Sequence, residues 1–151
     1  MIMKEIFDKL FEELRVVLKT NEFACHSIKE GRLFPVYKND TNEIGLVAWK
    51  QFHATNGIYI EENELLTEVC NEKKSISIDN LAKDNRNYSC FIAFNIKSIY
   101  VIPLIKDETV IAFIVIPVLK DYYEFTKDNK EKCEAIIKKS NDQIVELNLL
   151  A

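Results

Sequence analysis

The feature that most constrains the fold is a pair of β-rich runs, Ser98 to Ile105 and Thr109 to Leu119, separated by three polar residues. The first run is apolar on both of its faces, which carry Ile99, Val101 and Ile105 on one side and Tyr100, Ile102 and Leu104 on the other. A strand that is solvated on one face alternates apolar and polar residues. The two runs therefore predict a central antiparallel hairpin that is covered on both faces.

Two amphipathic helices at the ends of the sequence are expected to cover one face of that hairpin. Between residues 2 and 18, apolar side chains recur at steps of three and four, which indicates one apolar stripe on a helix. A second stripe predicts a helix over 126–149, with Thr126 as its N-cap. The apolar stripe residues are Ile6, Phe7, Leu10, Phe11, Leu14, Val17 and Leu18, together with Cys133, Ile136, Ile137, Ile144 and Leu147.

Between the first helix and residue 60, the sequence predicts a second hairpin. Its strands are 23–28 and 33–37, and Pro35 places the second of them at an edge or marks a bulge, because proline cannot donate to a ladder. A helix over 44–52 and a short strand over 57–60 are expected to follow.

The next segment, up to residue 96, is expected to contain a capped helix and one short strand. Asn63 is a suitable N-cap for a helix over 63–73, and Ser75 to Ile78 alternates as a half-buried strand that ends at Asp79. A loop over 81–87 and a short helix over 88–96 complete the segment. We therefore expect one α+β domain over 1–151, with a central antiparallel sheet. The terminal helices cover one face, and the middle elements enclose a pocket on the other.

Composition excludes several classes of function. The chain has 151 residues and a net charge of −4, without a basic block, so a nucleic-acid partner is not expected. The longest apolar run, 110–119, is too short to span a bilayer, and the N-terminus lacks the apolar stretch of a secretory signal. We expect a cytoplasmic protein. Its four cysteines are too widely spaced for a zinc site, and His26 and His53 lack neighbouring ligands, so we expect no metal and no cofactor.

Three stretches carry a resemblance to a known family: "GIYIEENELLTEVCNEKKSISIDNL", "SIYVIPLIKDETVIAFIVI" and "FTKDNKEKCEAIIKKSNDQI". Together with the order of elements, they resemble a GAF domain, the small-molecule sensor module of bacterial histidine kinases and other signalling proteins. The resemblance implies a non-catalytic sensory domain with a ligand pocket.

Seven residues are candidates for the pocket: Trp49, Asp79, Tyr88, Cys90, Phe94, Tyr100 and Phe113. Each has a simpler interpretation. Asp79 suits a turn that satisfies its own backbone, and the aromatic side chains suit an ordinary core.

The functional alternatives remain open. The domain binds an unidentified small molecule, or its pocket is filled and it only dimerises or docks a partner. A third hypothesis is a thiol-dependent free methionine sulfoxide reductase, an activity that some GAF domains have, and Cys90 is the one cysteine expected near the pocket. The apolar stripes of the terminal helices are wider than one sheet face requires, so we expect a homodimer through these helices.

Overall fold

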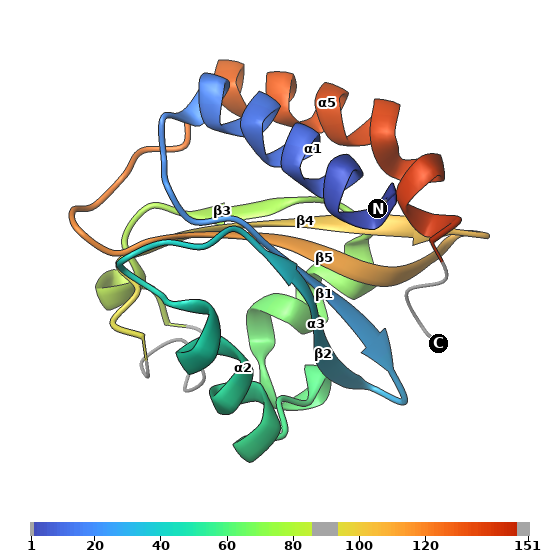
Figure 1. The fold of residues 1–151 in the computed structure, drawn as a ribbon. Helices are drawn as coiled ribbons and strands as arrows, with labels where there is room; N and C mark the ends of the chain where they lie inside the picture. The colour runs from blue at the N-terminus through green and yellow to red at the C-terminus, as the bar shows by residue number, and fades with distance from the viewer. Residues whose placement is uncertain (1, 86–93, 148–151) are drawn as a thin grey trace.

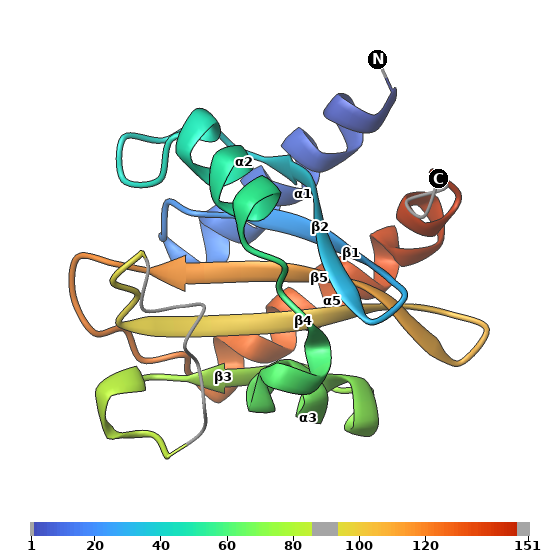
Figure 2. The same ribbon diagram turned by 90° about the horizontal axis from the view of Figure 1, so that it is seen from below.

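The computed structural model of the chain describes residues 2–85 and 94–147. Its centre is a five-stranded antiparallel sheet in the order β2-β1-β5-β4-β3. The strands are β1 (Ala24–Lys29), β2 (Arg32–Lys38), β3 (Ile76–Ile78), β4 (Ser98–Lys106) and β5 (Thr109–Val118). Within the described residues, helices lie on both faces of this sheet (Figures 1 and 2). The predicted α+β class is therefore confirmed.

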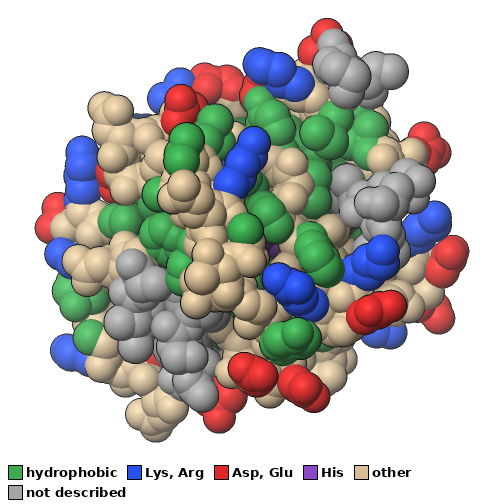
Figure 3. Space-filling model, turned by 60° about the horizontal axis from the view of Figure 1, so that its bottom comes forward, with side chains coloured by type: hydrophobic (Ala, Val, Ile, Leu, Met, Phe, Trp, Pro, Cys, Tyr) green, Lys and Arg blue, Asp and Glu red, His purple; other side chains and the backbone are tan. Residues whose placement is uncertain are grey.

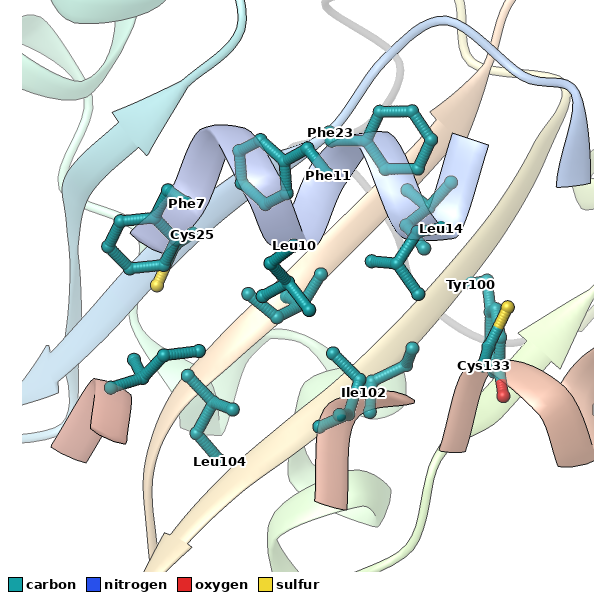
Figure 4. Packing of buried hydrophobic residues seen from close by; sticks show 14 of the residues in the cluster. Phe7, Leu10, Phe11, Leu14, Phe23, Cys25, Tyr100, Ile102, Leu104 and Cys133 are labelled. Carbon is teal, nitrogen blue, oxygen red and sulfur yellow. The ribbon is translucent and has the colours of Figure 1, made fainter. Parts of the chain in front are cut away.

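Helices α1 (Ile2–Leu18) and α5 (Lys127–Val145) lie side by side over one face of the sheet (Figure 1). Their apolar stripes pack on β1, β4 and β5 and form the larger hydrophobic core (Figure 4). Thr126 caps α5 by accepting a hydrogen bond from the Asn129 amide, as its sequence context predicts. The helix ends at Val145, four residues before the predicted end.

Helices α2 (Leu46–Thr55) and α3 (Glu64–Glu72) lie on the opposite face (Figure 2). Asn63 caps α3 through its side-chain oxygen, as predicted, and the apolar side of α3 packs on β4 and β5. The strand expected over 57–60 is reduced to one bridge between Arg32 and Tyr59, followed by a 3₁₀ turn over Ile60–Glu62. A second 3₁₀ turn, Leu81–Lys83, begins the predicted loop. Most of the helix predicted over 88–96 falls outside the described residues.

Both hairpins close through two-residue turns. Glu30 and Gly31 connect β1 to β2, and Asp107 and Glu108 connect β4 to β5, because Lys106 pairs with Thr109. All four turn residues have positive φ angles between 52° and 74°, which is the backbone geometry that matches the twist of the paired strands.

Each side of the sheet places a proline where no neighbouring strand among the described residues pairs: Pro35 in the outer strand β2, and Pro103 in β4 beyond the residues that β3 covers. The amide of Leu33 in β2 points outward to the Ile58 carbonyl at 2.9 Å, so by alternation Pro35, two residues on, occupies an outward-facing position. A bulge follows Pro35, as expected. On the other side, β3 pairs only with Ile99 to Val101 of β4.

Beyond the reach of β3, the edge of β4 is closed by side chains. The side-chain amide of Asn141 donates to the Ile105 carbonyl at 2.8 Å and accepts from the Ile105 amide at 3.0 Å. Ile105 therefore faces outward, and by the same alternation so does Pro103, which has no N–H to leave unpaired.

The stripe of α1 is already buried within one chain. Leu10 and Leu14 are 1% and 0% exposed, whereas Val16 on the outer side is 67% exposed. The core of one chain therefore uses the central part of this stripe. The homodimer stays a prediction. The apolar side chains in or next to α1 and α5 that are only partly buried, and so are available for an interface, are Met3, Ile6, Val17, Ile136 and Leu147.

None of the helices among the described residues is both long and apolar enough to cross a bilayer.

Candidate functional site

A small cavity lies between α2 and the part of the sheet that β1, β2 and β5 form. Its volume is about 60 Å³, which is room for about four water-sized groups. Most of its wall is apolar and comes from Ala24, Leu33, Ile44, Ile58, Leu66, Ile96, Val115 and Pro117. Hydrophobic side chains gather on this face of the molecule, and part of a histidine side chain is visible between them (Figure 3).

Three polar aromatic side chains meet at this cavity. Residues Trp49 and His53 lie one turn apart on α2 and are both buried against the sheet, while His26 projects from β1. The indole N–H of Trp49 donates to His26 Nε2 at 3.2 Å, and the Nε2 atoms of His26 and His53 are 3.1 Å apart. The three rings pack with centroid distances of 4.7 to 5.8 Å.

The hydrogen-bond partners assign the tautomers of the two histidines. An indole N–H only donates, so His26 Nε2 carries a lone pair and the proton of this ring is on Nδ1. His53 then donates from Nε2 and carries its lone pair on Nδ1. Both Nδ1 atoms are buried without a hydrogen-bond partner among the described residues.

Both rings are neutral at pH 7. Burial, together with the neighbouring His53, holds the pKa of His26 well below its usual value. Burial, together with the positive charge of Arg32, lowers the pKa of His53 to about 4. Arg32 also donates from Nη2 to the His53 carbonyl at 3.4 Å, so one cation lies directly beside the site.

Acid should destabilise the fold through these two rings. As the pH falls below about 6.5, histidines of the unfolded chain take up protons, whereas His53 stays neutral until about pH 4. The unfolded state then binds more protons, and the free energy of unfolding falls with pH. Each unit that separates the two pKa values contributes about 1.4 kcal/mol.

Urea unfolding of the wild type and of a His26→Gln, His53→Gln double variant between pH 7 and 5 measures this effect. The wild type should lose stability more steeply than the variant. Equal slopes would show that the two histidines titrate in the same way when folded and unfolded.

A buried ion pair forms another wall of the cavity. Lys38 at the end of β2 donates to Glu22 Oε2 at 2.5 Å, and each side chain is 2% exposed. Glu22 also accepts from the hydroxyl of Thr41 and from the Ile44 amide, and Lys38 donates to the Asn39 carbonyl at 2.9 Å. This network ties the segment before α2 to the sheet and thereby positions Trp49 and His53.

The predicted site residues separate into three groups. Trp49 and Phe94 line the cavity, and Phe94 also packs edge-on against Phe52 with ring centroids 4.9 Å apart. Tyr88 and Cys90 lie outside the described residues. The remaining three candidates, Asp79, Tyr100 and Phe113, do not line the cavity.

Tyr100 lies under the terminal helices, where it is fully buried beside Phe125 and Cys133. In β4 the even-numbered residues face that side, and the sequence pattern could not say which face was which, because both are apolar. Phe113 is on the expected face, but α3 covers it completely. Asp79 is exposed; its carboxylate accepts from the Phe125 amide at 3.1 Å and fastens the segment before α5.

Sequence reasoning missed four residues of this site: Glu22, His26, Lys38 and His53. The one local signal was the spacing of four between Trp49 and His53, which puts both on one helix face. Nothing local links either of them to His26, or Glu22 to Lys38, since these pairs are brought together only by the sheet and the packing of α2.

Several solved structures share this fold. This chain is similar to a GAF domain/HD domain protein from Geobacter sulfurreducens, with a TM-score of 0.79 and 12% identity. The match covers 97% of this chain and 94% of that one. The GAF domain of a two-component sensor histidine kinase from Bacillus halodurans matches 98% of this chain and 97% of that one, with a TM-score of 0.70 and 14% identity.

A third match is the PixJ GAF domain from Thermosynechococcus elongatus in its blue-light absorbing form. It covers 98% of this chain and 88% of that one, with a TM-score of 0.73 and 10% identity. No protein-family model and no curated protein matches the sequence.

Proposed function

Because the chain has the fold of GAF domains, we propose that it is a cytoplasmic sensory domain that binds a small molecule in the cavity beneath α2 and catalyses no reaction. One observation carries the proposal: an apolar cavity with three polar side chains converging at one point. Ligand sites in proteins have this composition.

The arrangement of layers supplies a route for a signal. A ligand beneath α2 contacts the sheet on the face opposite α1 and α5 (Figure 1). Since β1 contributes His26 to the cavity and Cys25 to the core beneath α1, a displacement of β1 reaches both sides of the sheet. We propose that the outer faces of α1 and α5 pass this change to a second copy of the chain.

The small volume of the cavity favours a second candidate, a scaffold whose pocket is filled by its own side chains. A space of about 60 Å³ is well below that of a drug-sized ligand site. Such a domain would dimerise or dock a partner without sensing anything.

A thiol-dependent reductase is the weakest candidate. Cys25 and Cys133 are buried, and burial raises the pKa of both thiols, that of Cys133 to about 12. Burial also raises the pKa of Cys70. A catalytic thiol needs a lowered pKa, so these three cysteines do not favour redox catalysis.

Thermal-shift measurements with small organic acids and small neutral molecules test the sensory proposal. A ligand present at 100 times its Kd stabilises the fold by about 2.7 kcal/mol, and each kcal/mol raises the Tm of a domain of this size by roughly 2–4 °C. A variant with Ala24→Leu, which fills the cavity wall, should lose the response.

The matched control is Ala54→Leu, the same change on the exposed side of α2. It should respond like the wild type. Absence of any response from the wild type across the whole set would favour the scaffold.

A further inference from the structure

Two nitrogen atoms converge on a third in the buried wall of the cavity. Trp49 Nε1 and His53 Nε2 approach His26 Nε2 at 3.2 and 3.1 Å. All three side chains are buried, at 4% to 7% exposure. They come from a helix and a strand that the fold brings together, so the convergence is a property of the tertiary structure.

This cluster has more donors than acceptors. A neutral imidazole offers one lone pair at Nε2, and two N–H groups, from Trp49 and His53, point at it. Meanwhile the Nδ1–H of His26 and the Nε–H of Arg32 are donors without a partner among the described residues, whereas the unpartnered Nδ1 of His53 carries a lone pair. Buried donors without acceptors are costly, so an added acceptor would satisfy groups that the protein alone leaves incomplete.

We propose that the N–H groups of Trp49, His26 and His53 form a binding site for the carboxylate of a small organic acid. The inference rests on the sensory function proposed above and names the ligand class of that site. In the bound form, the proton of His26 is on Nε2 instead of Nδ1. The ligand oxygen replaces His26 Nε2 as the acceptor, and the His26 ring moves back so that all three N–H groups point at that oxygen.

Charge and size support a carboxylate. Arg32 lies beside His53 and supplies a positive charge at the site, and a carboxylate oxygen accepts several N–H bonds readily. The cavity of about 60 Å³ accommodates about four small groups, which suits formate or acetate. The titratable groups that face the pair are Arg32, Glu22 and Lys38, and the last two neutralise each other.

A metal ion would use the same two histidines, but the geometry favours an acceptor. The indole N–H of Trp49 is aimed at the lone pair of His26 that a metal would need. Within the described part of the chain, no group of three His, Cys, Asp or Glu side chains stands ready to hold a metal. The experiment must therefore distinguish metal binding from carboxylate binding.

The whole chain is suited to a direct test because it contains one tryptophan and two histidines. The indole N–H of Trp49 gives a single resonance in a ¹H–¹⁵N spectrum. Titration with sodium formate and sodium acetate should shift this resonance downfield, with saturation, while sodium chloride at equal ionic strength should not. Long-range ¹⁵N spectra should show His26 change from the Nδ1–H to the Nε2–H tautomer.

A pair of variants at His53 isolates the hydrogen bond from the packing. Glutamine places an amide N–H where the imidazole Nε2–H lies, whereas leucine fills similar space without a donor. We expect His53→Leu to weaken acetate binding about 10- to 100-fold, the loss typical of a hydrogen bond to a charged group. His53→Gln should stay within a few fold of the wild type.

Three results would overturn this inference. If neither acid moves the indole resonance, no acceptor binds there; if stoichiometric Zn²⁺ moves it and the acids do not, the pair is a metal site. If the acids leave the indole resonance in place and thermal shifts reveal a neutral ligand, the sensory function stands and the carboxylate site fails. Only the absence of every ligand would remove both.

Discussion

Replacing Glu22 with alanine should lower the free energy of unfolding by about 3–5 kcal/mol, the cost typical of removing one partner of a buried ion pair. The change leaves the Lys38 ammonium at 2% exposure without its counter-charge, and it removes the carboxylate acceptor of the Thr41 hydroxyl and the Ile44 amide. Because this network holds the segment before α2, the variant should lose ligand response as well as stability. Urea unfolding followed by circular dichroism measures the first effect.

Two further variants show whether the loss comes from the unpaired charge. Glu12→Ala removes an exposed ion pair with Arg15 and should change stability by less than about 1 kcal/mol. Replacing both buried partners, Glu22→Leu with Lys38→Met, should recover most of the lost stability, because no buried charge remains. A double variant as unstable as Glu22→Ala would show that the charge is not the cause.

Replacing Leu14 with aspartate should unfold the chain. Leu14 is 0% exposed in the core between α1 and the sheet, and an unpaired carboxylate there has no partner to offset its desolvation. The comparison is Val16→Asp, two residues away on the same helix, where the side chain is 67% exposed. That variant should fold normally.

The same pair of variants bears on the proposed dimer. Circular dichroism and light scattering of both report folding and oligomeric state. A folded, monomeric Leu14→Asp chain would mean that the stripe of α1 serves an interface between copies and not the core of one chain. Unfolding of Leu14→Asp beside a folded Val16→Asp dimer would place the interface elsewhere on α1 and α5.

The elements that the sequence predicts well are those whose pattern extends over many residues. The paired runs in β4 and β5 and the stripes of α1 and α5 each repeat a period several times, so local errors cancel. Helix caps are predicted well for a different reason, because each depends on one residue: the side chains of Asn63 and Thr126 both accept a hydrogen bond from the amide three residues on. Turn and breaker residues in the middle of the chain are weaker signals. There the observed bounds of helices and strands differ from the predicted ones.

The candidate site is harder to predict from the sequence, because strand register and helix packing bring its residues together. A strand that is apolar on both faces does not reveal which face a given residue serves, so Tyr100 was expected on the wrong side. His26 and His53 are 27 residues apart and meet at 3.1 Å only after β1 and α2 dock. For the same reason, the partnership of Glu22 with Lys38 cannot be recognised before β2 is paired.

Pro35 of β2 and Pro103 of β4 limit how this protein can associate through its sheet. Pro35 and Pro103 interrupt the row of donors that another strand would need at either side, and Asn141 occupies the next pair of groups on β4. Edge-to-edge pairing of copies into fibrils through these parts of the sheet is therefore disfavoured. A peptide that extends the sheet therefore meets a proline on β2 and another on the part of β4 beyond β3.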